Sequence, residues 1–400
     1  TRQAIMAFLD RAQAYVDRSI AENVRPNRLY HAYNLMRLSP DGKAISIRRL
    51  DEMLEGQVAV LSSGYLTIAE VLEVLSALKS SALYREDQYS YLLYPDRQLP
   101  RFLEKNRIPA EQVQQSLLLM RLLEEGRNAL VEQDVRGGYH FNGAFRNAGD
   151  VRQALDRLAA QGYESLVQQE SGQVLALFET VFDHASFTGR SGTFYGYEGL
   201  GSIYWHMVSK LLLAVGEVYY QARDRGEAEA HCGRLIEHYY DIRAGIGFNK
   251  PPEVYGAFPT DPYSHTPGNA GAQQPGMTGQ VKEDILARWL ELGLEIREGE
   301  IHFRPILLRS LEFLQAPASF ACYSLSGEAK TIGLPAHTLA FTCCQVPVIY
   351  HQSPDSHIRI TFHDGSTQEI RGLSLGKSHS AALFAREDSI EKIEVWLMSL

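Results

Sequence analysis

The sequence predicts a helical domain over residues 1–294 followed by a β-sandwich over residues 295–400. Two observations support this division. Apolar residues recur with helical spacing as far as Gly293, and from there they follow the alternation that is typical of strands. Turn pairs such as Ser326-Gly327 and Asp364-Gly365 then separate the short later segments, as expected for a sheet built from hairpins. The chain is therefore expected to be mainly α-helical.

The expected helices follow the 3.6-residue spacing of apolar side chains. They cover residues 2–20, 46–60, 67–82, 110–125, 149–161, 172–184, 198–221, 226–242 and 278–293. The pattern is clearest after Gly201, where it continues to Tyr219 and predicts a helix buried on most sides. On the narrow polar side of that helix lies His206, which we interpret as a core histidine. The clearest expected strands are residues 301–304, 357–362 and 390–397.

Composition excludes several classes of function. With 39 basic and 48 acidic groups among 400 residues, the net charge is −9, so the chain has no basic surface for nucleic acid. The sequence has no apolar run long enough to predict a membrane span. Four scattered cysteines and histidines without ligand spacing predict neither a disulfide framework nor a metal site, which favours a cytoplasmic protein. The sequence starts at Thr1 instead of Met, so we expect part of a longer protein.

The connections between the expected helices point to a binding face. Several are long, at residues 21–45, 83–109, 134–148, 185–197 and 243–277, and they are rich in Tyr, Phe, His, Asn and Gly. Planar polar groups beside aromatic rings are suited to sugars, because rings stack on the apolar faces and polar groups bind the hydroxyls. Glycoside cleavage also requires two carboxylates, or one carboxylate and phosphate, across the bond.

The densest polar segment is residues 255–283, where small residues and prolines surround the polar side chains. Asp261 is its candidate catalytic carboxylate. The candidate sugar-binding residues of this segment are Tyr263, His265, Gln273 and Gln274. The segment leads into a helix that begins at Thr278 and Gly279, whose free N–H groups are suited to an anion. Thr278 is equally well explained as a simple N-cap.

A second polar segment, residues 187–199, precedes the long apolar helix. Glu198 lies there among glycines and aromatic rings, so it is a candidate general acid, and it could equally balance the helix dipole. Arg190, Tyr197 and Trp205 are the candidate sugar-binding residues of this region. Glu55, just before the apolar run from Val58 to Leu61, is the reserve carboxylate.

Residues 255–306 resemble the end of the catalytic domain of inverting disaccharide phosphorylases of the cellobiose and chitobiose phosphorylase type. The resemblance rests on Thr278-Gly279 at a helix start, the run from Leu292 to Arg297 and the run from Ile301 to Pro305. It implies an (α/α)6 toroid that precedes the β-sandwich. Because twelve helices are needed and about nine are expected, either some loops contain short helices or the N-terminal part of the toroid is missing. The resemblance also implies that Thr278 and Gly279 contact phosphate, with the chain corresponding to the C-terminal part of such an enzyme.

Departures from that pattern bear on whether the glycosidic bond is cleaved by phosphate or by water. Gln280 and Glu283 replace a hydroxyl residue and a tryptophan of the family, and the loop before Trp205 lacks the family's phosphate-binding histidine. We therefore expect an inverting glycoside hydrolase that acts on a β-linked oligo- or polysaccharide without a cofactor. The alternatives are a phosphorylase with inorganic phosphate as co-substrate, a lyase acting on uronic acids, and a non-catalytic sugar-binding or structural segment. The sequence leaves the sugar, the linkage and the oligomeric state open.

Overall fold

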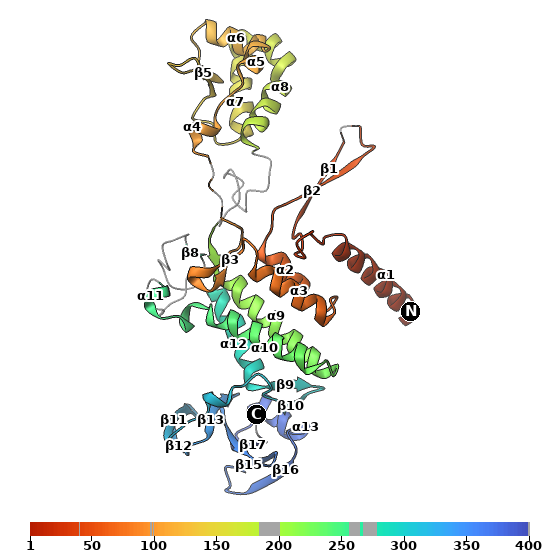
Figure 1. The fold of residues 1–400 in the computed structure, drawn as a ribbon, viewed down its shortest axis with the longest axis vertical. Helices are drawn as coiled ribbons and strands as arrows, with labels where there is room; N and C mark the ends of the chain where they lie inside the picture. The colour runs from red at the N-terminus through yellow and green to blue at the C-terminus, as the bar shows by residue number, and fades with distance from the viewer. Residues whose placement is uncertain are drawn as a thin grey trace.

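A computed structural model describes residues 1–39, 41–96, 98, 100–183, 201–255, 265–266 and 278–398. The buried apolar residues of these ranges form three clusters, which we call the first, second and third cores. The first core lies in the middle of the molecule, with the second and third cores at its opposite ends (Figure 1). Residues 1–294 thus contain two cores, and the expected boundary at residue 294 falls at the first residue of strand β9 (Leu294–Arg297).

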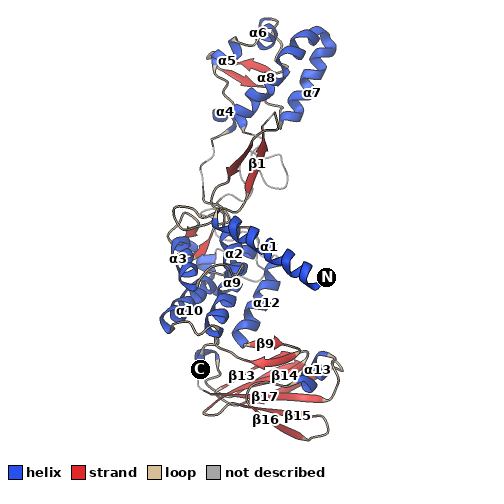
Figure 2. Ribbon diagram, turned by 90° about the vertical axis from the view of Figure 1, so that its right-hand side faces the viewer, coloured by secondary structure: helices blue, strands red, loops and turns tan. Residues whose placement is uncertain are grey.

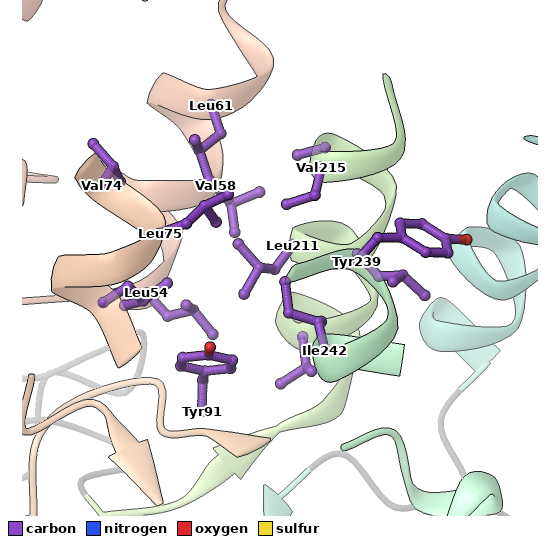
Figure 3. Packing of buried hydrophobic residues seen from close by; sticks show 14 of the residues in the cluster. Leu54, Val58, Leu61, Val74, Leu75, Tyr91, Leu211, Val215, Tyr239 and Ile242 are labelled. Atoms are coloured by element: carbon purple, nitrogen blue, oxygen red, sulfur yellow. The ribbon is translucent and has the colours of Figure 1, made fainter. Parts of the chain in front are cut away.

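Five helices build most of the first core. They are α2 (Leu54–Ser62), α3 (Ile68–Lys79), α9 (Trp205–Asp224), α10 (Glu229–Ala244) and α12 (Thr278–Leu292). As the apolar pattern predicted, α9 is buried on most sides, since α2, α10 and α12 all pack against it. Figure 3 shows Leu54 and Val58 of α2 packed with Leu75 of α3 and Leu211 of α9. Thr67 starts α3 with a capping box to Glu70, which satisfies two otherwise unpaired backbone donors.

The first core also contains short strands and turns. These are β3 (Tyr84–Arg85), η1 (Glu86–Gln88), β4 (Ser90–Tyr91), β7 (Ile203–Tyr204), η3 (Gly247–Asn249), α11 (Pro252–Tyr255) and β8 (His265–Thr266). Strand β7 pairs with β8, and Leu92 forms a bridge to Ile203. The described helices do not by themselves form a ring of six hairpins, so the toroid stays a prediction.

Two N-terminal elements project from this core in Figures 1 and 2, namely helix α1 (Arg2–Ala21) and the hairpin of β1 (Asn34–Leu38) with β2 (Ile45–Arg49). The hairpin corrects the helix expected over residues 46–60. Ile45 and Ile47 alternate with polar residues and pair with β1, and the helix begins only at Leu54. Across the described residues, none of the helices is both long and apolar enough to cross a membrane.

The second core is a compact body of residues 102–182. It contains α4 (Phe102–Lys105), α5 (Ala110–Gln114), α6 (Leu117–Glu124), β5 (Val131–Gln133), β6 (Tyr139–Phe141), α7 (Ala148–Leu158) and α8 (Glu164–Phe182). A π-helical turn (Ala159–Tyr163) reverses the chain between α7 and α8, where Gly162 adopts a φ of 99°. Phe141 and Phe178 pack edge-to-face in its centre, and Phe182 packs on Phe178.

The third core confirms the expected strand-rich C-terminal region. Its main sheet has the order β13-β14-β17-β15-β16, from strands β13 (Thr338–Cys343), β14 (Val346–Ser353), β15 (His357–Phe362), β16 (Thr367–Arg371) and β17 (Ile390–Met398). Strand β17 pairs in parallel with β14 and antiparallel with β15. Strand β17, which comes last of the five in the sequence, therefore lies in the middle of the sheet.

A hairpin and a helix pack against this sheet. Phe303 of β10 (Glu300–Phe303), which pairs with β9, meets the ring of Tyr350 edge-to-face, and Leu383 of α13 (Lys377–Phe384) joins the same core. A separate hairpin pairs β11 (Ala318–Tyr323) with β12 (Ala329–Leu334). The strand-rich part of the expected β-sandwich is thus confirmed, and apolar residues of the β9–β10 hairpin and of α13 pack in the same core as the five-stranded sheet.

Candidate functional site

Three helices of the first core begin at the same end, which we call the strand end. Helices α9 and α12 run parallel, because Ser209 bonds to Asp284 near their starts and Tyr220 bonds to the Leu290 carbonyl near their other ends. The backbone N–H of Leu54 at the start of α2 donates to the carbonyl of Leu93, beside the bridge to β7. The strand end therefore collects three helix N-termini and the strands β4, β7 and β8.

A buried carboxylate joins two of these helix starts. Glu283 of α12 is almost completely buried, and its Oε2 lies 3.0 Å from Nε2 of His206 in the first turn of α9. Its other oxygen, Oε1, lies 3.2 Å from Nζ of Lys282. Neither Nε2 of His206 nor Oε2 of Glu283 has a hydrogen-bond partner among the described residues, so the two atoms are close without hydrogen-bond geometry. We call this contact the His206–Glu283 pair. It fixes the start of α9 against the start of α12.

This pair joins the two helices that follow, in the chain, the segments that the sequence singled out. Glu198 comes shortly before α9 in the chain, and Thr278 and Gly279 are the first two residues of α12. The helix predicted to open at Thr278 is thus confirmed. The His206–Glu283 pair sets the distance between the helices that follow both segments, so it belongs to the framework of any site they form.

A second buried group at the strand end is the side chain of Lys250, which follows η3. Its Nζ lies 4.6 Å from the ring centre of Trp205 and 3.4 Å from Oε1 of Gln88. Burial, followed by the positive charge of Arg85 and opposed by the charge of Asp87, lowers the pKa of Lys250 to about 7. A lysine in this environment can exchange its proton near neutral pH, which is uncommon for an ammonium group.

The structure places some of the predicted site residues and not others. Glu55 is half-buried in the first turn of α2, and Trp205 is buried as the first residue of α9, beside the ring of Tyr255. His265 lies in β8, where its backbone pairs with Tyr204. The remaining candidates fall outside the described residues, namely Arg190, Tyr197, Glu198, Asp261, Tyr263, Gln273 and Gln274.

Two residues of the strand end were missed as site candidates. We interpreted His206 as a core histidine, but its partner is the buried Glu283 at the start of another helix. A signal existed, because Glu283 follows Thr278 by little more than one helical turn. Lys250 gave no usable signal, since a single lysine in a long connection has no pattern. Within the described ranges, the structure brings together no group of three or more His, Cys, Asp or Glu side chains suited to a metal ion.

Comparison with known proteins assigns one part of the chain. Residues 99–185 match a family model described as GH149 phosphorylase insertion domain 2, and this range coincides with the second core. No curated protein matches the chain. The matched region is an insertion domain, so it gives no support to the expectation that the chain corresponds to the C-terminal part of such an enzyme. The match supports a relationship to GH149-type glycoside phosphorylases, which are carbohydrate-active enzymes.

Proposed function

We propose that the protein cleaves glycosidic bonds of a β-linked oligo- or polysaccharide with inorganic phosphate as the acceptor. The match of residues 99–185 to a phosphorylase insertion domain carries this proposal, and it favours phosphorolysis over the hydrolysis that the sequence alone suggested. In the proposed reaction a phosphate oxygen forms a bond to the anomeric carbon, while the bond from that carbon to the glycosidic oxygen breaks. The departing oxygen takes a proton from an enzyme carboxyl group.

The proposed roles follow the two segments that precede α9 and α12 in the sequence. Glu198 or Asp261 donates the proton, with Glu55 in reserve, and Thr278 and Gly279 at the start of α12 bind phosphate. Arg190, Tyr197, Trp205, Tyr263, His265, Gln273 and Gln274 contact the sugar. The His206–Glu283 pair supports this arrangement, because it holds the helix that follows Glu198 against the helix that begins with Thr278.

The test incubates the protein with a panel of β-linked oligosaccharides, with and without inorganic phosphate, and separates the products. We expect a sugar phosphate only when phosphate is present. Equal release of free sugar in both arms would contradict phosphorolysis and establish the hydrolase. A product that absorbs in the ultraviolet would identify a lyase, and binding without turnover would indicate a non-catalytic module.

Variants then locate the acid. Glu198→Gln or Asp261→Asn should lower turnover by about 100-fold or more, which is the scale of general acid catalysis. The matched control is Glu73→Gln on α3, whose carboxylate is half-exposed and lies 3.7 Å from Nε of Arg28. Losses in the two test variants that are no larger than in the control would refute both assignments. Thr278→Ala should raise the KM for phosphate more than the KM for the saccharide.

A further inference from the structure

The first core contains a buried positive charge that none of the described carboxylates balances within ion-pair distance. In the described part of the chain, the buried charged side chains are Arg85, Glu170, Lys250, Glu283 and Glu291. Glu170 accepts three hydrogen bonds at the start of α6. Arg85, Glu283 and Glu291 each lie within ion-pair distance of an oppositely charged or titratable side chain. Among these described side chains, Glu170 and Lys250 have no oppositely charged side chain within ion-pair distance. Glu170 is satisfied by three hydrogen-bond donors, whereas the charge of Lys250 faces one amide oxygen and an aromatic ring.

The contacts of Lys250 use only part of its bonding capacity. An ammonium group has three N–H donors, and one of them faces Oε1 of Gln88 at 3.4 Å. The amide of Gln88 is held in that orientation, because its Nε2 donates to the carbonyl of Val254 at 2.7 Å. The ring of Trp205 covers another side of the ammonium at 4.6 Å. Gln88 and Trp205 are themselves buried, which leaves the site pre-organised around a cation.

These contacts do not offset the burial of the charge. Removing an ammonium from water costs several kcal/mol even after relaxation. The cation–π contact with Trp205 and the 3.4 Å hydrogen bond to Gln88 recover only part of this cost, because desolvation still lowers the pKa of Lys250. Arg85 lies close enough to oppose the charge of Lys250, and its partner Asp87 is half-exposed. The three groups together have a formal charge of +1, which is a favourable environment for an anion.

We propose that Lys250 binds a phosphate dianion, either as inorganic phosphate or as the phosphoryl group of a sugar phosphate. The inference rests on the proposed phosphorolysis for the identity of the anion. A compact ammonium is a common phosphate ligand, because it acts as a point charge and needs no bidentate geometry. Lys250 lies on Trp205, the residue that precedes His206 in α9, so it belongs to the strand end at which α12 begins with Thr278.

The competing explanation is that Lys250 is a neutral amine that only fills space beside Trp205. The two explanations differ in what Lys250→Met and Lys250→Arg do. A space-filling amine is replaced well by Met, which has a similar length and no charge. A phosphate ligand is lost in Lys250→Met and is largely kept in Lys250→Arg. Lys79→Met is the matched control, because Lys79 lies on α3 of the same core and is paired with Asp241.

The experiment measures anion binding to the intact chain by calorimetry, with inorganic phosphate, sulfate and a hexose 1-phosphate as separate probes. Lys250→Met should weaken binding of phosphate by about 10-fold or more, and Lys250→Arg should stay within a few-fold of the unsubstituted protein. Lys79→Met should leave binding unchanged. Tighter binding of the free ion identifies inorganic phosphate as the ligand, and tighter binding of the hexose 1-phosphate identifies the sugar phosphate.

Sulfate binding measures the charge of Lys250 independently, because sulfate keeps its charge near neutral pH whereas Lys250 loses a proton there. The affinity for sulfate should fall between about pH 6 and about pH 8.5 in the unsubstituted protein and stay nearly constant in Lys250→Arg. Equal phosphate affinity in Lys250→Met and the unsubstituted protein would overturn the inference, as would the absence of anion binding by either. The two proposals can also be separated. If Lys250→Met weakens anion binding but the unsubstituted protein shows no phosphate-dependent cleavage, the anion site is supported and the proposed function is refuted.

Discussion

At the scale of single residues, the molecule balances most of its buried charges with several partners each. Glu291 of α12 is the clearest example. Its oxygens lie 2.7 Å from Nε of Arg243 and 2.7 Å from Nη1 of Arg288, and the hydroxyl of Tyr239 donates to it at 2.9 Å. Burial, followed by the nearby charge of Glu291, raises the pKa of Tyr239. The carboxylate thus connects α10 to the end of α12.

Glu291→Gln should therefore lower the free energy of unfolding by about 3 kcal/mol, the typical cost of removing one member of a buried ion pair. The expected cause is Arg243, which loses its buried partner, whereas Arg288 keeps Glu312 at 2.7 Å. Urea unfolding followed by circular dichroism measures the change. The exposed Glu73→Gln serves again as the control, and a loss as small as in that control would show that the network adds nothing to stability.

Sequence patterns predict residues of this kind poorly. Thr278 and Thr67 could be placed at helix starts, because a helix N-terminus favours a hydroxyl side chain and the apolar pattern after it marks the helix. The His206–Glu283 pair and the contacts of Lys250 could not, since they join residues far apart in the chain. Local spacing reports which face of a helix is buried, and it does not report what lies opposite that face.

At the scale of elements, the hairpin of β5 and β6 is held by a charged contact. Nε2 of His140 lies 2.9 Å from Oδ2 of Asp134, and its Nδ1 bonds to the carbonyl of Asn106. The carboxylate raises the pKa of His140, and the imidazole, followed by backbone N–H groups of the turn, lowers the pKa of Asp134 to about 2. The contact is strongest when both groups are charged.

The pH dependence of this hairpin follows from those two shifts. The raised pKa of His140 contributes stability that is complete below its ordinary value of 6.5 and is lost as the pH rises through the folded value. The lowered pKa of Asp134 contributes stability above 3.8, which is lost as the pH falls towards about 2. The second core should therefore be most stable between these limits. Thermal unfolding across pH measures this, and a profile that is unchanged in Asp134→Asn would contradict it.

Elements were predicted well where a long apolar stripe is uninterrupted. The helices expected over residues 67–82 and 278–293 correspond to α3 and α12, and the strand expected over residues 357–362 is β15. The error over residues 46–60 arose where a short alternating strand adjoins a helix, because both patterns supply apolar residues at overlapping spacings. In such a place only the partner strand decides, and a partner cannot be read from local periodicity.

At the scale of the whole molecule, the second core is a separate body with its own packed centre. Helix α8 contacts both α6 and α7, and the aromatic cluster of Phe141, Phe178 and Phe182 is buried in the same core. An ion pair joins this body to the hairpin of β1 and β2, between Arg48 and Asp183 at 3.1 Å. Both side chains are half-exposed, so this pair contributes at most about 1 kcal/mol.

We therefore expect residues 100–183 to fold when expressed alone. The fragment should show helical circular dichroism and a cooperative thermal transition, because its core does not depend on the rest of the chain. A gradual transition without cooperativity would show that the first core is required. The sequence did not predict this separate body, since its helices have the same apolar spacing as those of the first core and only long-range contacts divide them.

The position of β17 has a consequence for how the protein is made. Ribosomes deliver the chain from its N-terminus, so the hairpins β13–β14 and β15–β16 emerge before the strand that lies between them. Until residues 390–398 leave the exit tunnel, each hairpin exposes an unpaired edge to other nascent chains. A premature stop codon shortly before Ile390 would make that exposure permanent. Messages truncated there should yield insoluble product, although the helices and strands up to residue 389 have all been translated.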